Sequence, residues 1–479
     1  MQLPLDEIFG GFDFGAVKTV AVAISGGSDS TALLFLLQDY FKTLPVAPHI
    51  LAITIDHRLR PESGREAHEV SALCARTGIE HVTSGWSGSK PKTGLQAAAR
   101  NARYALLSEA AARAGATLVL TGHTFDDQLE TVAMRMARDG SPDNAGLAGI
   151  APCTLAFSDL RDGEPIWFAR PLLKVRRAAL RDYLEGRGIG YIDDPSNVND
   201  KYERVAVRQS ALDEAMLARV QGEAAARRFE SCHGAAELID RYAQEVTPGL
   251  VFVAPEICDE PLAVHALTAL IALAGGAGWL AEPSSAETLL RGLADFKAGT
   301  RKAPLRMTAS GALVDIRKSG IYLMREKRGV LEPSKRAAFD GFYREVAMAP
   351  TGPSFRGGKA EPGIQSCGGE NSDEKVEAVN VPKASSLFTS PSGSPLWIPG
   401  SATRPRNDGV IVNAPIPPSL LAHARLTHPV LESGTAVRRL INPWPDLVPL
   451  FDLEMARALT KMTGVTALPV PPIHFDDKN

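Results

Sequence analysis

The stretch Thr19-Val-Ala-Val-Ala-Ile-Ser-Gly-Gly-Ser-Asp-Ser-Thr31 decides the fold of the N-terminal part of this chain. Residues 19–24 form an apolar run with several β-branched side chains, which is typical of a strand buried in a parallel sheet. Two glycines in the following turn allow a positive φ and a close approach by a ligand. Asp29 and Ser30 then mark a helix start. Free backbone N–H groups and the positive end of the helix dipole would meet at this turn, which predicts a phosphate site. An ordinary strand-to-helix turn with a Ser/Asp cap is the alternative.

The composition is that of an ordinary globular protein with several domains. The chain has 479 residues, 44% of them hydrophobic and 22% charged. Its net charge of −3 means that any RNA contact must come from local basic patches. Its five cysteines form no C-x-x-C pair, which argues against a zinc ribbon, an iron–sulfur site or a disulfide framework. Without a signal-peptide pattern or an apolar run of about 20 residues, we expect a soluble cytoplasmic protein with no membrane contact.

Strands and helices alternate along the N-terminal part. Further strands are predicted at 49–55, 79–83 and 117–121, with helices at 63–77 and 94–114. This pattern indicates an α/β fold with a parallel sheet that binds ligands at the carboxyl ends of its strands. Ser25 to Asp29, Asp56-His57 and Gly122-His123 all fall at such ends. Their convergence favours the phosphate site over the ordinary turn.

Three acids follow His123 at the start of a predicted helix, namely Asp126, Asp127 and Glu130. Acids near a helix N-terminus complement its dipole, and one acid would be explained fully in that way. Asp126 and Glu130 are four residues apart and share a face of the helix. Three acids beside a histidine favour a site for Mg²⁺ or for an ammonium group.

Basic residues gather after Arg170. A helix predicted at about 175–187 carries cations on its polar faces, and a polar loop at 193–197 is followed by more: Lys174, Arg176, Arg177, Arg181 and Arg187, then Arg204 and Arg208. Such a set is usually a solvated helix face. Phosphate contacts along an RNA-facing edge are the functional interpretation.

The alternating pattern stops near residue 212, which divides the chain into three predicted domains. A catalytic domain over 1–214 is followed by a mainly helical middle domain over 215–330, which ends in a β-hairpin at 302–325. A small α+β C-terminal domain over 331–479 includes an insertion at 349–400 that is rich in Pro, Gly and Ser and is predicted to be a long loop or disordered.

Several motifs resemble a known family. The Ser25–Ser30 motif after a strand resembles the PP-loop, or N-type ATP pyrophosphatase, superfamily. Within it, the chain is similar to the tRNA(Ile)-lysidine synthetase family through five stretches in the family's order: Ser25–Ser30, Asp56–Pro61, Ala99–Tyr104, Thr121–Thr131, and Arg170–Leu173 with Asp194–Asn197 and Arg204–Arg208. Two departures are Val205, where the family usually has Asn, and Gly122, at one position of a common His-His pair. The second half of the chain is similar in outline to the long, three-part members.

The resemblance implies a two-step reaction. ATP activates the C2 carbonyl of the wobble cytidine in the minor tRNA(Ile) with a CAU anticodon, and the ε-amine of free L-lysine then displaces AMP. Mg²⁺ on Asp29 would neutralise phosphate charge. The implied catalytic residues are Asp29, His123, Asp127 and Glu130. The implied nucleotide-binding residues are Ser25, Gly26, Gly27, Ser28, Asp29, Ser30, Asp56 and Arg100. The implied substrate- and RNA-binding residues are Arg103, Asp126, Arg170, Lys174, Arg176, Arg204 and Arg208. A homodimer is also considered.

Two alternatives are considered, one enzyme of the same superfamily and one protein of a different class. A PP-loop tRNA thiolase activates a base in the same way but delivers sulfur, commonly through paired cysteines, and this chain has no suitably spaced pair. A non-catalytic nucleotide- or RNA-binding regulator of the same fold would not need the acids after His123. ATP–pyrophosphate turnover separates the enzyme from the regulator, and dependence on an amine or on sulfur separates the two enzymes.

Overall fold

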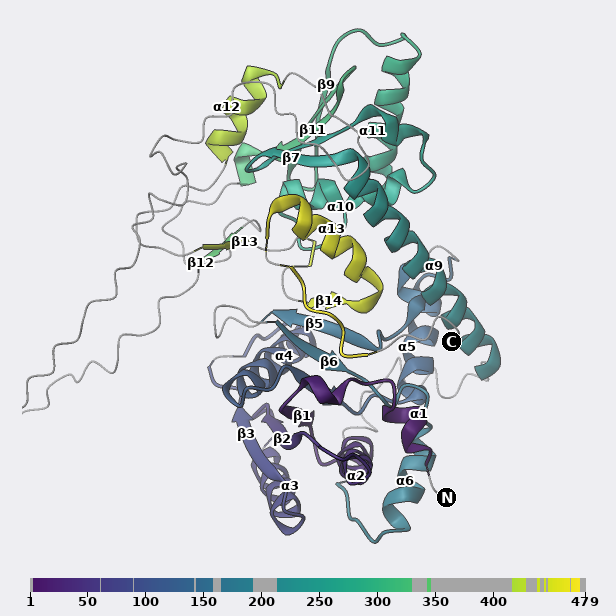
Figure 1. The fold of residues 1–479 in the computed structure, drawn as a ribbon, viewed down its shortest axis with the longest axis vertical. Helices are drawn as coiled ribbons and strands as arrows, with labels where there is room; N and C mark the ends of the chain where they lie inside the picture. The colour runs from purple at the N-terminus through teal and green to yellow at the C-terminus, as the bar shows by residue number, and fades with distance from the viewer. Residues whose placement is uncertain are drawn as a thin grey trace, which may run out of the picture.

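The computed structural model describes residues 3–60, 62–88, 90–141, 144–157, 165–192, 213–329, 343–345, 416–427, 437–439, 443–444, 447–465 and 467–473. Two bodies lie along the long axis of the molecule, with the N-terminal body at the bottom of Figure 1. The long helix α9 (Glu214–Tyr242) runs along one side of the molecule and links the two bodies. In the described part of the chain, no helix has the length and apolar character needed to cross a membrane.

The N-terminal body is built on a seven-stranded, mostly parallel sheet with the order β14-β5-β6-β4-β1-β2-β3. The strands from β6 to β3 are parallel, whereas β5 and β14 add antiparallel at one edge. Their bounds are β1 (Thr19–Ala23), β2 (His49–Asp56), β3 (Glu80–Gly85), β4 (Leu118–Thr121), β5 (Cys153–Phe157), β6 (Pro165–Ala169) and β14 (Leu447–Pro449). The predicted α/β architecture is therefore confirmed. The antiparallel edge was not predicted.

Helices cover both faces of this sheet because successive strand residues point to opposite sides. Val20 and Val22 pack in the core that contains Leu33 of α2, whereas Ala21 packs in the core that contains Leu107 of α4. The helices of this body are α1 (Leu5–Phe9), α2 (Ser28–Phe41), α3 (Ser63–Arg76), α4 (Leu95–Arg113), α5 (Phe125–Arg138) and α6 (Arg177–Glu185), with 3-10 turns η1 (Phe14–Ala16) and η2 (Ala145–Ala148). The first residue of α2 directly follows the glycine turn.

The second body combines helices with a five-stranded antiparallel sheet of order β7-β8-β11-β10-β9. Its elements are β7 (Ala243–Thr247), β8 (Leu250–Val253), η4 (Pro255–Asp259), α10 (Ala263–Gly275), α11 (Pro283–Lys297), β9 (Leu305–Ala309), β10 (Ala312–Arg317), β11 (Gly320–Arg325) and η5 (Lys327–Gly329). The sequence predicted the helices but only a hairpin of strands. Positive φ at Ser310 and Gly311 makes the turn that splits the predicted first strand into β9 and β10.

Further elements come from the C-terminal part of the chain. Helix α12 (Pro418–Thr427) packs on β11 and β8, and β12 (Tyr343–Glu345) pairs with β13 (Val437–Arg439). The 3-10 turn η7 (Leu450–Asp452) leads into α13 (Leu453–Thr463), which packs against α9. The predicted insertion at 349–400 lies outside the described residues.

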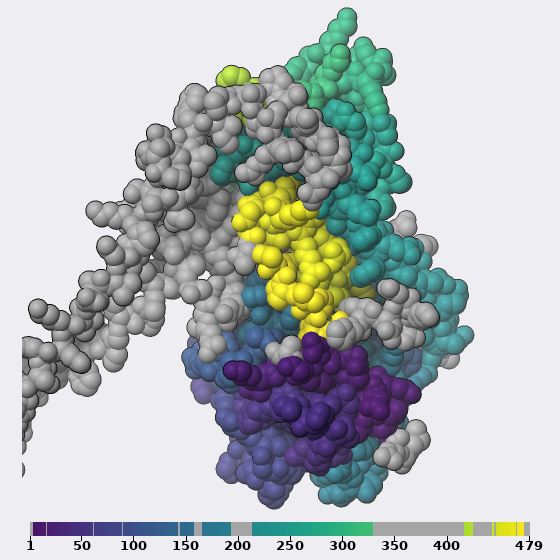
Figure 2. All heavy atoms as spheres, viewed as in Figure 1, coloured from purple at the N-terminus to yellow at the C-terminus, as the bar shows by residue number. Residues whose placement is uncertain are grey.

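The predicted separate domain over 331–479 needs a correction, because residues 447–473 pack with the N-terminal body. Strand β14 pairs with β5, and a bridge joins Phe12 to Ile473. The Asp13 N–H also donates to the Pro472 carbonyl at 3.0 Å. Figure 2 shows this segment, in yellow, wedged between the two bodies. No sequence pattern predicts this return, since a three-residue strand is too short to show a period.

Candidate active site

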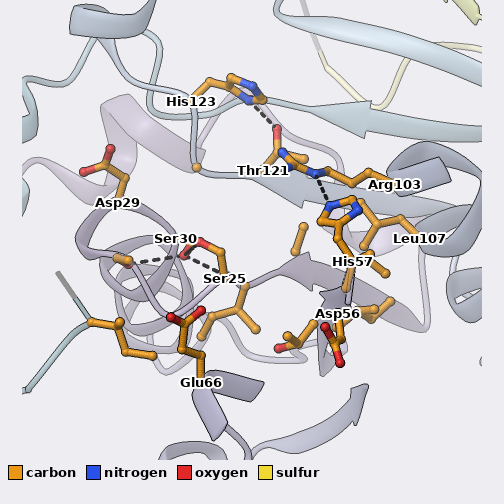
Figure 3. Close-up of a pocket in the computed structure, with 18 of the residues that line it drawn as sticks. Ser25, Asp29, Ser30, Asp56, His57, Glu66, Arg103, Leu107, Thr121 and His123 are labelled. Atoms are coloured by element: carbon orange, nitrogen blue, oxygen red, sulfur yellow. Dashed lines mark hydrogen bonds between the residues drawn. The ribbon is translucent and has the colours of Figure 1, made fainter. Parts of the chain in front are cut away.

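A cavity of about 900 Å³ opens at the carboxyl ends of β1, β2 and β4. In Figure 3, Ser25, Asp29 and Ser30 gather on one side of it, and Asp56, His57 and Arg103 lie on the other. His123 also lines the cavity, together with Asp127, Glu130 and Arg177. The structure thus brings together most of the predicted site residues at the predicted edge of the sheet.

The turn after β1 is held in shape by its own serines. The Ser25 N–H donates to Ser30 Oγ at 3.1 Å, and Ser30 Oγ donates to the Gly27 carbonyl at 3.2 Å. Ser30 is only 8% exposed, whereas Ser25 is an exposed residue at the cavity wall. Ser30 therefore shapes the loop from beneath, and the Ser25 hydroxyl, at the cavity wall, lies 3.2 Å from Ser30 Oγ.

Two glycines are required by close packing around this turn. Gly26 has φ +87°, and a Cβ there would lie 2.6 Å from the Ile192 side chain. A Cβ at Gly122 would lie 2.9 Å from the Ser30 backbone nitrogen. The first turn of α2 thus packs directly on the chain that follows β4, which leaves no room for a side chain at Gly122.

Arg177, the first residue of α6, binds the acids of the site. Its Nε donates to Asp29 Oδ2 at 2.9 Å, and its Nη2 donates to Asp127 Oδ1 at 2.7 Å. Its Nη1 lies 3.7 Å from Glu130 Oε1. Burial raises the pKa of Asp29, although the guanidinium of Arg177 opposes that rise. From the sequence, Arg177 is predicted only as one of the cations of an RNA-facing helix, because nothing in a single sequence indicates that α6 starts beside α5.

Asp127 has a second function as the third residue of α5. Its Oδ2 accepts hydrogen bonds from the N–H and the hydroxyl of Thr124, at 2.7 and 2.9 Å, in a capping box. The helix-cap alternative is therefore correct for one oxygen of Asp127. The other oxygen, Oδ1, points to Arg177 and the cavity.

His123 is held by a hydrogen bond of 3.0 Å between its Nδ1 and Thr121 Oγ1. Thr121 Oγ1 also donates to the Ala169 carbonyl at 3.4 Å, so this threonine joins His123 to the end of β6. Burial, reinforced by the positive charge of Arg170, lowers the pKa of His123 far below its ordinary value, against the effect of Asp127. This shift favours the neutral imidazole.

Arg170 is buried beneath the site at 4% exposure. Its guanidinium donates to the Ala151 carbonyl at 2.7 Å, to Thr154 Oγ1 at 3.1 Å and to the Tyr104 hydroxyl at 3.0 Å. The predicted RNA contact of Arg170 thus needs a correction, since these partners give it a structural position that joins α4 to the strands β5 and β6.

The far side of the cavity carries Asp56 and a group of cations. Partial burial opposes ionisation of Asp56, but hydrogen bonds from the Ser63 side chain and the Arg58 N–H outweigh it and lower its pKa. Arg103 Nε donates to His57 Nε2 at 3.4 Å, and Arg100 lies against the Tyr104 ring. This side of the cavity combines one carboxylate with positively charged side chains, as expected for a site that binds a nucleotide.

The remaining predicted RNA-binding residues lie outside the cavity or outside the described chain. Arg176 is exposed and pairs with Glu214 at 2.5 Å, and it lies 3.9 Å from Asp126. Asp126 Oδ2 accepts the Arg177 backbone N–H at 2.8 Å, and Lys174 is exposed. Arg204 and Arg208 fall outside the described residues.

The donors around Asp29 fit a magnesium ion that is also bound by phosphate. Mg²⁺ is usually held by one or two carboxylates plus substrate phosphates. Among the described residues, no group of three His, Cys, Asp or Glu side chains could hold a metal by itself. Asp29, in the first turn of α2 beside the glycine turn, supplies one carboxylate of the kind that holds such an ion together with substrate phosphate.

Comparisons with known proteins agree with this geometry. Residues 7–215 match the model of a PP-loop domain. A tRNA(Ile)-lysidine synthase of Mesorhizobium japonicum is 36% identical over 494 residues, covering 98% of this chain and 96% of the relative. The chain belongs to the tRNA(Ile)-lysidine synthase family. A tRNA(Ile)-lysidine synthase of Brucella suis is 39% identical and covers 74% of this chain and 81% of the relative.

The family predicted from the motifs is therefore confirmed, as is the PP-loop fold of the N-terminal body. A solved U34-tRNA thiolase, NcsA of Methanococcus maripaludis with its [4Fe-4S] cluster, covers 46% of this chain and 74% of its own, at 18% identity and a TM-score of 0.37. A likeness this low supports no conclusion about activity.

Proposed function

We propose that this tRNA(Ile)-lysidine synthase family member ligates L-lysine to C2 of the wobble cytidine in the tRNA(Ile) with a CAU anticodon. The reaction consumes ATP, passes through an adenylated tRNA and releases AMP and pyrophosphate. The observation that carries the proposal is that one guanidinium, Arg177, binds both Asp29 beside the glycine turn and Asp127 on α5. A phosphate subsite and an amine subsite would therefore be neighbours in a single cavity.

In the first step, the C2 carbonyl oxygen of cytidine attacks the α-phosphate of ATP. A new P–O bond forms while the bond between the α-phosphorus and the bridging oxygen breaks, and pyrophosphate leaves. The turn at 25–30 would receive the departing negative charge through N–H and hydroxyl donors. Asp29 would hold Mg²⁺, which neutralises phosphate charge when bound. Neutral His123 and the nearby cations Arg100 and Arg103 would orient the reactants.

In the second step, the neutral ε-amine of lysine attacks C2. A C–N bond forms, the C2–O bond to AMP breaks, and the amine loses a proton. A carboxylate within hydrogen-bond reach can orient the amine and take that proton. Asp127 and Glu130 are suited to this, because both lie on α5 and line the cavity.

The tRNA would enter with its anticodon loop toward the cavity. Bases in a loop can be splayed into a pocket without melting a duplex. Lysidine at the wobble position would change codon recognition from AUG to AUA and tRNA identity from Met to Ile. Exposed Lys174 and the adjacent Arg176 would contact phosphates, as would Arg204 and Arg208. A cytoplasmic location and a homodimer stay predictions.

The thiolase and the regulator are less well supported. None of the described residues that line the cavity is a cysteine, although sulfur transfer commonly uses one. A regulator would have no need for the acids that face Arg177.

The experiment is an incubation of the protein with ATP, L-lysine and unmodified CAU-anticodon tRNA(Ile). Mass analysis should detect the addition of lysine with loss of water at one cytidine. An unchanged tRNA with folded protein, or a gain that persists without lysine, would refute the proposal. ATP–pyrophosphate exchange without any lysine addition would favour the other adenylating enzyme.

A further inference from the structure

Arg177 occupies the oxygens that an amine substrate would need. A guanidinium and an ammonium ion recognise carboxylates through the same charge-assisted hydrogen bonds. Asp127 Oδ2 is already committed to Thr124, so Oδ1 is the oxygen left to face a ligand. That oxygen accepts from Arg177 at 2.7 Å, and Glu130 Oε1 lies 3.7 Å from the same guanidinium. Lysine would therefore compete with Arg177 for these acids in this arrangement.

The same side chain also reaches the phosphate subsite. Its Nε donates to Asp29, in the first turn of α2 and one residue past Ser28, which lines the cavity. Guanidinium binds phosphate oxygens in the bidentate mode that it uses for carboxylates. A nucleotide in the glycine turn would thus offer Arg177 a competing anion close to its present partners. The Arg177 side chain is 23% exposed, which leaves it room to turn.

The backbone of Arg177 is fixed independently of its side chain. Its N–H donates to Asp126 Oδ2 at 2.8 Å, and Leu180 and Leu184 anchor α6 with no exposed surface. The guanidinium can therefore move while α6 stays in place. For the same reason, a variant that changes only this side chain should fold.

We propose that Arg177 excludes the amine substrate from Asp127 and Glu130 until a bound nucleotide draws its guanidinium to phosphate. This inference rests on the proposed function and adds an order to it, in which ATP binds before lysine. Arg177 is a positioning residue in this scheme, because it acts by blocking and releasing the acids and forms no bond to the reacting carbon.

The test measures L-lysine binding to the full-length protein by calorimetry, with and without the non-hydrolysable analogue α,β-methylene-ATP and Mg²⁺. The wild type should bind lysine at least about tenfold more tightly with the analogue than without it. Arg177→Gln should bind lysine without nucleotide at least about tenfold more tightly than the wild type does, since it removes a positive charge within hydrogen-bond distance of the acids. Arg177→Lys should restore most of the nucleotide dependence.

Arg219→Gln is the matched control. It removes an arginine of α9 that pairs with Glu223 outside the cavity, so lysine binding should keep the wild-type pattern. Melting temperatures of the two glutamine variants show whether both are folded. Arg177→Gln that binds lysine no more tightly than the wild type without nucleotide would overturn the exclusion.

The wild-type tRNA mass test distinguishes failure of the exclusion by Arg177 from failure of the proposed function. If the wild type adds lysine to tRNA while Arg177→Gln gains no affinity, the exclusion fails and the proposed function stands. If the wild type adds no lysine, both fail.

Discussion

The ion pair between Arg228 of α9 and Asp452 of η7 should hold the C-terminal segment on α9. Arg228 donates twice to Asp452, at 2.8 and 2.6 Å, and Trp444 Nε1 donates to the same carboxylate at 3.1 Å. The side chain of Asp452 is only 7% exposed and that of Arg228 24%. The change Arg228→Met keeps much of the apolar stem and leaves a buried carboxylate with Trp444 as its remaining donor among these groups.

The magnitude follows from burial. Breaking a buried pair by removing one partner costs about 3–5 kcal/mol, and the partial exposure of Arg228 reduces this to about 2–4 kcal/mol. The control is Lys461→Met, which removes an exposed pair with Asp240 between α13 and the same helix α9. Exposed pairs contribute about 0–1 kcal/mol. Each variant therefore breaks one ion pair between the C-terminal segment and α9, and the two pairs differ in how deeply they are buried.

Native-state hydrogen exchange of peptides that cover residues 447–463 measures the opening of this segment. Arg228→Met should accelerate exchange there by about 30-fold or more, since about 2 kcal/mol corresponds to that factor. Lys461→Met should change it by less than about fivefold. Equal effects of the two variants, or a change below fivefold in Arg228→Met, would refute the argument from burial.

Three further predictions concern the cavity. Gly26→Ala should lower ATP affinity by about tenfold or more and destabilise the fold by about 1–3 kcal/mol, because φ is positive and the Ile192 side chain fills the space for a Cβ. Gly27→Ala should change both quantities far less, because its φ is −68° and the nearest atom to a Cβ lies at 3.7 Å. Parallel ATP titrations and urea melts measure the two variants. The pKa of His123 is lowered in the folded chain, so below about pH 6.5 the unfolded chain binds a proton that the folded chain does not. The free energy of unfolding should therefore fall by roughly 1 kcal/mol per pH unit below about pH 6.5. His123→Asn should flatten that part of a plot of urea midpoint against pH. Asp127→Asn should abolish lysine addition to the tRNA while ATP binding survives. A loss of ATP affinity would show that Asp127 belongs to the nucleotide subsite and not to the amine subsite.

The sequence alone predicted the residues whose position follows from a local rule. Ser25, Asp56 and His123 end parallel strands, and parallel strands end at one edge, so their meeting could be foreseen. The role of Arg177 could not, because it depends on how α6 packs beside α2 and α5. Arg170 illustrates the converse, since a basic residue predicted to contact RNA is buried here at 4% exposure, directly after β6.

The C-terminal return was also beyond the reach of sequence patterns. Leu447–Pro449 pairs with β5 through three residues only, and a run that short carries no readable period. Its position depends on long-range packing of α13 against α9. The described chain thus places a C-terminal strand in the sheet that also carries the cavity.

The most direct test of the central claim uses isotopically labelled lysine. After incubation of the wild-type protein with ATP, labelled lysine and unmodified CAU-anticodon tRNA(Ile), the tRNA is digested to nucleosides and analysed by mass spectrometry. The account predicts one labelled nucleoside, cytidine plus lysine minus water, that forms only when ATP is present. Consumption of ATP to AMP and pyrophosphate with no label in any nucleoside would contradict it.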